Sequence, residues 1–211
     1  AVKRKINFVH EEFVPLATTD FTASMQRILD KMKGATGKKY IVVIWGAPNP
    51  LRKLSELLPK GQDIEFVSIG GANHENIKPW AGLPVSGGMY YFYTFPKNPM
   101  NDAFVAESIK RYKTPPDLFS AGGFITAAAI INGLKKAGST DPEKLIAAME
   151  TMDFDTPKGK MTFRKEDHQA MQSQYVFRTK KAPGASEWDV VDLVREVPAS
   201  EMPVPIKVKP R

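Results

Sequence analysis

The sequence predicts an α/β fold in which parallel strands are covered by helices. Over residues 6–69, strand-like runs alternate with helical patterns of about ten residues, as is typical of right-handed βαβ units. Residues 40–45 (YIVVIW) are continuously apolar, as expected for a strand that is buried on both faces. Residues 117–138 (DLFSAGGFITAAAIINGLKKAG) predict the central helix, around which the rest of the chain is organised.

This central helix has apolar residues on nearly every face. Asp117 is a good N-cap, Lys135 and Lys136 suit the last turn, and Gly138 can end the helix. A helix that is apolar all round must be packed on several sides. Because an asparagine and the two lysines interrupt the apolar run, it is shorter than a membrane span requires. We therefore expect a core helix that needs several neighbours.

The composition is that of a globular chain of one or two domains. It has 211 residues, of which 42% are hydrophobic, and 30 basic against 23 acidic residues give a net charge of +7. The lysines are scattered, so we expect a solvated basic surface and no nucleic-acid partner. The sequence contains no cysteine for disulfides or thiolate metal sites. The first residues, AVKRKINFV, include neither an initiator Met nor an apolar signal segment, and suggest a piece of a longer protein.

The helices and strands of the first half are predicted from residue spacing and from the Gly and Pro residues that mark their ends. Predicted strands are residues 6–13, 40–45, 64–69 and the aromatic run 88–95 (GMYYFYTF). Predicted helices are residues 18–34, capped by a Thr-Thr-Asp sequence, and residues 50–58. Tight turns at residues 46–49 and 70–73 follow the second and third strands.

In the second half the pattern changes from helices to strands near residue 152. Predicted helices are residues 102–112, 117–138 and 141–149, and predicted strands are residues 160–164, 174–179 and 190–196. The residues from 198 onward predict an extended tail. Three consecutive helices have no strand among them to pack on, so we expect their sheet to lie in sequence outside this chain. The chain alone would then expose Ile125, Ile130 and Ile131.

The sequence lacks the local motifs of common enzymes. It contains neither GxGxxG after a strand nor a Walker loop, and neither HExxH nor GxSxG. Asp167 and His168 could form an acid–base pair, although a polar turn between two strands is the simpler explanation and the one we expect. We expect His10 to be an ordinary residue of an exposed strand face. The sequence therefore predicts no enzyme, no cofactor and no metal site.

Residues suited to a ligand occur where predicted elements end or begin. In open α/β sheets, ligands bind at the carboxyl ends of the strands. Trp45 precedes a small-residue turn at such an end, where a ligand can reach backbone N–H groups and a flat apolar ring. His74 follows the next strand, and Phe119 follows the cap of the central helix. The alternatives are core packing for Trp45 and Phe119, and an ordinary loop position for His74.

Five segments of the chain form a specific combination through their order and spacing. They are EEFVPLATTDFTASMQRI, IVVIWGAPNPLRKL, YTFPKN, PDLFSAGGFITAAAIINGLKKAGSTDPEKL and TPKGKMTFRKEDHQ. The combination resembles the periplasmic solute-binding proteins of branched-chain amino acid ABC transporters, which are the Leu/Ile/Val-binding type with the periplasmic binding protein type I fold. The resemblance covers nearly the whole chain.

The resemblance implies two α/β lobes with parallel sheets flanked by helices and a ligand clamped between the lobes. The first half of lobe one would be absent from this chain, which explains the missing sheet. Residues 1–94 and 172–197 would form lobe two. Residues 95–171 would be the helical remainder of lobe one, followed by the tail 198–211.

The resemblance also implies which residues face the ligand. They are Trp45, Ala47 and Pro48 after one strand, Gly71 and Asn73 after the next, and Phe119 as an apolar wall; His74 completes the predicted site. Amino-acid binders of this type tend to place an acid in the second loop, where this chain has Asn73, with Glu75 the nearest acid. Burying an ammonium without a counter-charge costs several kcal/mol by rough estimate. An aromatic or other carboxylate is therefore favoured over an α-amino acid.

Together these expectations predict a non-enzymatic, periplasmic solute-binding protein. It would capture a small carboxylate, either an amino acid or an aromatic acid, by hinge closure and deliver it to an ABC transporter permease. The complete protein is expected to be a monomer. The alternative on the same fold is the ligand-binding domain of a sensor or regulatory receptor.

Overall fold

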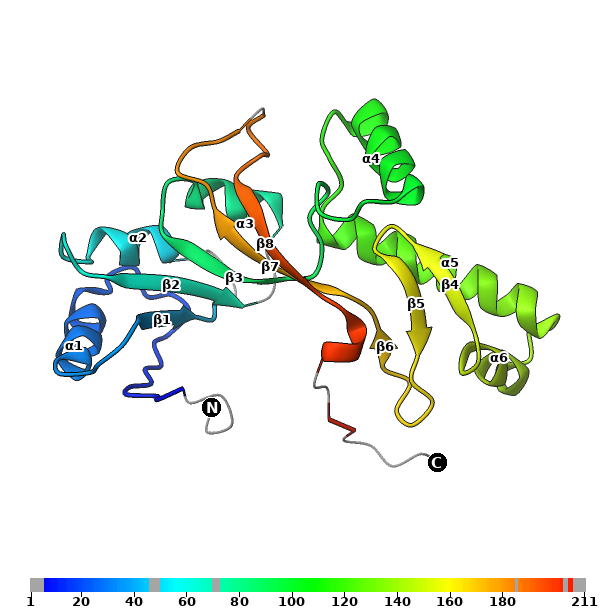
Figure 1. The fold of residues 1–211 in the computed structure, drawn as a ribbon, viewed down its shortest axis with the longest axis horizontal. Helices are drawn as coiled ribbons and strands as arrows, with labels where there is room; N and C mark the ends of the chain where they lie inside the picture. Colours follow the sequence, from blue (N-terminus) through cyan, green and yellow to red (C-terminus); the bar gives the residue numbers. More distant parts are fainter. Residues whose placement is uncertain (1–5, 46–49, 70–72, 185, 203–204, 207–211) are drawn as a thin grey trace. The chain divides into compact units, whose positions relative to one another are not determined.

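The structure is a computed structural model that describes residues 6–45, 50–69, 73–184, 186–202 and 205–206 (Figure 1). The chain divides into two compact units. Unit 1 comprises residues 1–69, 75–87 and 178–192, and unit 2 comprises residues 70–74, 88–177 and 193–211. The predicted lobe boundaries at 94/95, 171/172 and 197/198 refer to ligand-binding lobes and stay a prediction.

Unit 1 contains the predicted βαβ arrangement. Its elements are helices α1 (Thr22–Met32), α2 (Leu51–Glu56) and most of α3 (His74–Ile77), the 3₁₀ helix η2 (Lys78–Trp80), and strands β1 (Lys39–Val43) and β2 (Ile64–Ile69). β1 and β2 are parallel, with Lys39 opposite Ile64 and Val43 opposite Ser68. Strands β3 (Val85–Met89), β7 (Gln174–Thr179) and β8 (Val191–Val197) complete a sheet of order β1-β2-β3-β7-β8 (Figure 1). Each of these three belongs partly to unit 1 and partly to unit 2.

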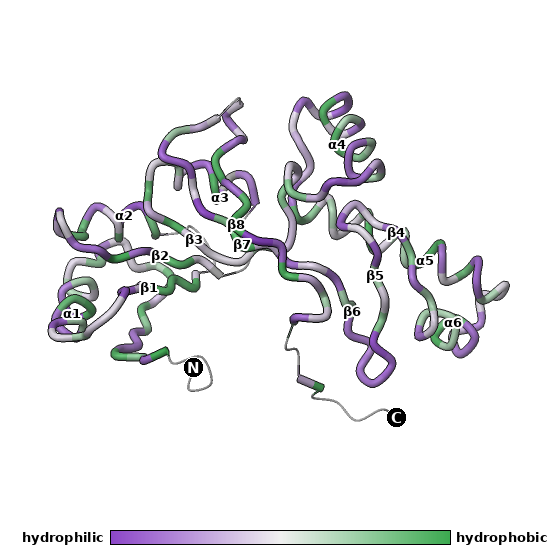
Figure 2. Tube along the Cα trace, viewed as in Figure 1, coloured by the Kyte–Doolittle hydropathy of each residue, from purple (hydrophilic) through white to green (hydrophobic). Residues whose placement is uncertain are grey.

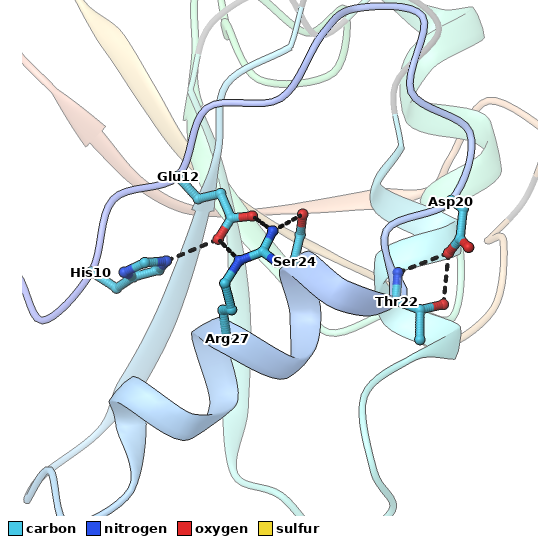
Figure 3. Close-up of polar contacts among 6 residues, drawn as sticks. All are labelled: His10, Glu12, Asp20, Thr22, Ser24 and Arg27. Atoms are coloured by element: carbon cyan, nitrogen blue, oxygen red, sulfur yellow. Dashed lines mark hydrogen bonds and ion pairs between the residues drawn. The ribbon is translucent and has the colours of Figure 1, made fainter.

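The prediction of a strand over residues 6–13 is wrong, because residues 6–15 have no regular structure. A strand needs a neighbour for its backbone groups, and β1 ends the sheet order in the part of the chain that the structure describes. Side chains hold the segment instead: Glu12 accepts hydrogen bonds from Nη2 and Nε of Arg27, the latter at 3.2 Å, and lies 2.9 Å from Nε2 of His10 (Figure 3). The Arg27 hydrogen bonds are the main cause that lowers the pKa of Glu12 to about 2.

The predicted Thr-Thr-Asp cap ends one residue before the N-cap position of α1: the N-cap residue is Phe21, which makes no side-chain capping bond. The carboxylate of Asp20 accepts hydrogen bonds from the backbone N–H of Thr22 at 2.9 Å and from its hydroxyl at 2.7 Å (Figure 3). These bonds satisfy a backbone donor that the first turn of the helix leaves unpaired.

Unit 2 consists of helices followed by a small antiparallel sheet. Its helices are α4 (Pro99–Tyr112), α5 (Leu118–Ala137) and α6 (Pro142–Met149), and η3 (Ala199–Glu201) follows β8. Strands β4 (Asp153–Thr156), β5 (Gly159–Phe163) and β6 (Ala170–Met171) form the sheet in that order, with both pairs antiparallel. The carboxylate of Asp117 caps α5, and Gly138 ends it with a φ of 60°, as the sequence predicted.

One face of α5 forms the core of unit 2. Its buried residues recur every fourth position, at Ala121, Ile125, Ala129 and Gly133. Ile125 and Ala129 pack with Met152, Phe154 and Met161. A Cβ on Gly133 would lie 3.0 Å from side-chain atoms of both Leu145 and Met149, so α6 approaches α5 closely because this position is glycine.

The opposite side of α5 is exposed in the described part of the chain. Ile130 and Ile131 are exposed there, as predicted, whereas the prediction that Ile125 would be exposed is wrong because the β4–β5 hairpin covers it. The hydropathy along the chain can be followed in Figure 2. By length and composition alone α5 could cross a membrane, contrary to the estimate from sequence. We interpret it as a packed helix, since its buried face joins a core with α6 and the hairpin.

The exposed isoleucines lead to a prediction about the isolated chain. We expect the 211-residue chain to increase the fluorescence of a hydrophobic dye, and Ile130→Gln/Ile131→Gln to reduce this increase at least twofold, because dye binding follows contiguous exposed apolar surface. Ile146→Gln on α6 is the control, since Ile146 is also exposed but lies on another helix. Equal dye binding by the double variant and the parent chain would contradict the prediction.

Candidate functional site

The structure describes four of the seven predicted site residues. Ala47, Pro48 and Gly71 lie outside the described residues. Trp45 belongs to unit 1, and Asn73, His74 and Phe119 belong to unit 2.

Trp45 is a half-buried aromatic residue just beyond the carboxyl end of β1. Its ring meets the buried ring of Phe21 edge to face, with the ring centroids 5.7 Å apart and an interplanar angle of 78°. The indole Nε1 is buried and has no hydrogen-bond partner among the residues that the structure describes. Phe21 thus holds the indole in place, while Trp45 as a whole remains half-exposed.

His74 is buried at the start of α3, with 9% of its surface exposed. Its ring lies edge to face against Phe92 at 5.9 Å and against Tyr93 at 5.8 Å, measured between ring centroids. The sequence placed this histidine in a loop after β2 but could not show that the aromatic run beyond β3 would surround it. Asn73, directly before it, is half-buried and presents a neutral amide.

Phe119 is 67% exposed in the first turn of α5. The backbone N–H groups of Phe119 and Ser120 each donate to Oδ1 of Asp117 at 3.0 Å, which fixes the start of the helix. Because the ring is largely exposed, Phe119 does not belong to the core of unit 2 as described. The capped turn therefore holds an exposed aromatic ring at a defined position.

Asn101 is a buried polar residue that the sequence reasoning missed. Its Oδ1 accepts a hydrogen bond from the hydroxyl of Tyr91 at 2.7 Å, and its Nδ2 donates to the carbonyls of Tyr93 at 3.0 Å and Pro96 at 3.1 Å. These bonds turn the chain after Met89, so the predicted strand over residues 88–95 is wrong beyond that residue. Because Tyr93 also contacts His74, Asn101 positions the aromatic surroundings of a predicted site residue.

Asp167 and His168 have separate partners. Nε of Arg164 donates to Oδ1 of Asp167 at 2.7 Å, and this bond is the main cause that lowers the pKa of Asp167. His168 lies with its Nε2 at 2.9 Å from Oε1 of Glu150 and has a φ of 56°. Both interactions fasten the segment between β5 and β6, which favours the polar-turn interpretation. Among the described residues, no group of three or more His, Asp or Glu side chains is placed to hold a metal ion.

Comparison with known proteins finds similarity to periplasmic binding proteins. The family described as "Periplasmic binding protein" matches residues 1–184. A leucine-, isoleucine-, valine-, threonine- and alanine-binding protein of Pseudomonas aeruginosa is 27% identical over 146 residues, which are 68% of this chain and 38% of that protein.

Two solved structures extend the comparison. An ABC-type branched-chain amino acid transporter from Rhodopseudomonas palustris is 50% identical with a TM-score of 0.85, covering 96% of this chain and 54% of that chain. A solute-binding protein of an ABC transporter from the same species, in complex with 3,4-dihydroxybenzoic acid, is 23% identical with a TM-score of 0.64, covering 88% and 51%. This chain thus spans about half the length, or less, of the relatives it matches. The observed elements are those of the periplasmic binding protein type I fold, and the chain belongs to the periplasmic binding protein family.

Proposed function

We propose that this protein is a periplasmic solute-binding protein that captures a small carboxylate between two lobes and delivers it to the permease of an ABC transporter. The observation that carries the proposal is the family match over residues 1–184, with branched-chain amino acid transport proteins among the relatives. The protein itself performs no chemical reaction. The lobes close because the ligand binds more tightly to the closed state than to the open one.

The proposed binding residues are those at the ends of β1 and β2 and at the start of α5. They are Trp45, Ala47, Pro48, Gly71, Asn73, His74 and Phe119. The half-buried Trp45 and the exposed Phe119 carry aromatic rings suited to cover the apolar part of a ligand. His74, which is buried between Phe92 and Tyr93, would act mainly by holding the loop after β2 in place.

The proposed ligand class is an aromatic or hydrophobic carboxylate without an amino group. Residues 70–74 (GGANH) contain no acid to pair with an ammonium, and Asn73 is neutral. An uncompensated ammonium in a closed site costs several kcal/mol by rough estimate. The relative in complex with 3,4-dihydroxybenzoic acid supports an aromatic acid, whereas the names of the other relatives support a branched-chain amino acid as the competing ligand.

Titration calorimetry on the complete protein tests this ligand class. We expect benzoate-type acids to bind more tightly than leucine or valine. Phe119→Ala should weaken benzoate binding roughly 2- to 13-fold, since a ring contact contributes about 0.5–1.5 kcal/mol beyond its buried area. Asn73→Asp should also weaken it, because it places a carboxylate beside the ligand. Ile131→Ala is the control, because Ile131 is equally part of α5 but far from its capped first turn.

Two outcomes would contradict parts of the proposal. Tight binding of leucine with no response to benzoates would contradict the ligand class and leave the transport function standing. Uptake of the bound ligand that persists at the normal rate after deletion of the gene would contradict delivery to a permease. Intact binding with such persistent uptake would favour a sensory receptor on the same fold.

A further inference from the structure

Lys158 is a buried lysine in the turn between β4 and β5, and only 6% of its surface is exposed. Its backbone N–H donates to the hydroxyl oxygen of Thr156 at 3.1 Å, and that hydroxyl donates to the carbonyl of Gly159 at 2.7 Å. Asn98, the N-cap of α4, donates from Nδ2 to the carbonyl of Pro157 at 3.0 Å. Hydrogen bonds of Thr156 and of Asn98 therefore hold the turn in place, and the side chain of Lys158 is directed inward.

The amine of Lys158 faces aromatic rings. Nζ lies 3.7 Å from the ring centroid of Tyr90 and 5.7 Å from that of Tyr175. Nζ is buried and, within the described residues, has no hydrogen-bond partner. Glu196 on β8 is exposed and acts only through its charge, which favours the ammonium form. Burial raises the pKa of both tyrosines, so their hydroxyls stay neutral around pH 7.

The neighbouring lysine of the same hairpin has a different environment. Lys160 is 67% exposed in its side chain, and its Nζ lies 3.2 Å from carboxylate oxygens of both Asp153 and Asp155. Its charge is therefore solvated and paired in the folded protein. For Lys158, attraction by two ring faces and by a distant carboxylate does not replace the lost water. Desolvation lowers the pKa of Lys158 to about 7, against the opposing effect of Glu196.

We propose that Lys158 is a proton-sensitive latch, which docks the β4–β5 turn onto Tyr90 and Tyr175 when its amine is neutral and favours release of the turn when it is charged. Tyr90 directly follows β3, and Tyr175 lies in β7. These are strands through which the chain passes between its two units. If the protein closes by hinge motion, as proposed above, the latch would make the segments next to the hinge respond to pH. This link between the latch and hinge closure rests on the proposed function.

The direction of the pH effect follows from the two states. In the released turn the amine is in water with an ordinary pKa near 10.5, whereas in the docked turn its pKa is about 7. Below pH 7 the amine is charged in both states, and the docked state bears the full cost of burying that charge. Between about pH 7 and 10.5 the released turn binds one proton more than the docked turn. Docking therefore becomes more favourable as the pH rises, by up to about tenfold per pH unit.

Hydrogen exchange of the complete protein without ligand, between pH 6.5 and 9, tests the latch independently of ligand binding. After correction for the intrinsic exchange rate, protection of the β4–β5 amides should rise with pH above 7, by up to about tenfold per unit. Lys158→Met should abolish this rise and give high protection already at pH 6.5. Lys160→Met is the matched control and should retain the rise.

Two results would overturn the proposal: a flat pH profile in the wild-type protein, or an unchanged rise in Lys158→Met. An NMR titration of the Lys158 side chain gives a second measurement that needs no variant. A midpoint near pH 7 is expected, and a midpoint near 10 would overturn the proposal. Failure of the ligand predictions would leave both measurements unaffected, because neither uses a ligand.

Discussion

Asn101→Ala is expected to lower the free energy of unfolding by about 3–5 kcal/mol, because it removes the amide that bonds two buried polar groups and one half-buried one, at about 1–3 kcal/mol each. These groups are the hydroxyl of Tyr91 and the carbonyls of Tyr93 and Pro96, all bonded to an amide that is only 2% exposed. Denaturant unfolding of the complete protein, followed by circular dichroism, measures the loss.

Two further variants test whether the loss of stability comes from the buried amide of Asn101. Asn132→Ala on α5 is the control, because its Nδ2 bonds to the carbonyl of Ala128 at the exposed surface; a change within about 1 kcal/mol is expected. Asn101→Asp keeps the shape but turns a carboxylate toward two carbonyls. Since the charged form is disfavoured in the fold, the pKa of that carboxyl is raised, and the stability of this variant should fall as the pH rises through it. A loss below about 1 kcal/mol in Asn101→Ala would contradict the role of the amide.

Phe154→Ala is expected to cost about 3–5 kcal/mol of stability, the usual range for removing a buried aromatic ring. Phe154 is buried on β4 against Ile125 and Ala129 of α5, and its ring stacks with that of Phe163 at 6.1 Å between centroids. The ring therefore joins the hairpin to the central helix. Removal of the ring leaves a cavity, because α5 and the hydrogen-bonded β4–β5 hairpin are held too firmly to move together and fill it.

The measurement for Phe154 is denaturant unfolding combined with hydrogen exchange of α5. Phe154→Leu should cost less than half as much, since it keeps most of the buried apolar volume. Thr162→Ala on β5 is the control, because Thr162 is exposed, and it should change stability by less than about 0.5 kcal/mol. Equal stability of Phe154→Ala and the parent protein would show that this cluster is not the core of unit 2.

The sequence predicted those features that depend on residues close together in the chain. Asp117 and Gly138 delimit α5 because a capping carboxylate and a left-handed glycine act on the neighbouring backbone. The continuously apolar run over residues 40–45 correctly indicated a strand in a parallel βαβ unit. The prediction that this strand is buried on both faces is wrong, because β1 ends the sheet order in the described part of the chain and exposes Tyr40 and Val42. The order and spacing of five segments were enough to indicate the family, which the match over residues 1–184 confirms.

For the candidate site, the sequence could indicate positions but not surroundings. Trp45, Asn73, His74 and Phe119 were chosen because they follow strand ends or a helix cap, and their role in binding stays a prediction. Their exposure was decided by residues far along the chain. His74 is buried by Phe92 and Tyr93, whereas Phe119 remains exposed although it is as apolar as the core residues of the same helix.

The sequence by itself therefore determined the βαβ order, the ends of the central helix and the family. Only the tertiary structure decided that residues 6–13 form no strand, that Asn101 ends the aromatic strand early and that Lys158 is buried. The physical reason is the range of the interactions. Caps and periodicity act within a few residues, whereas strand pairing and the burial of a polar group depend on partners that only the folded chain brings into contact.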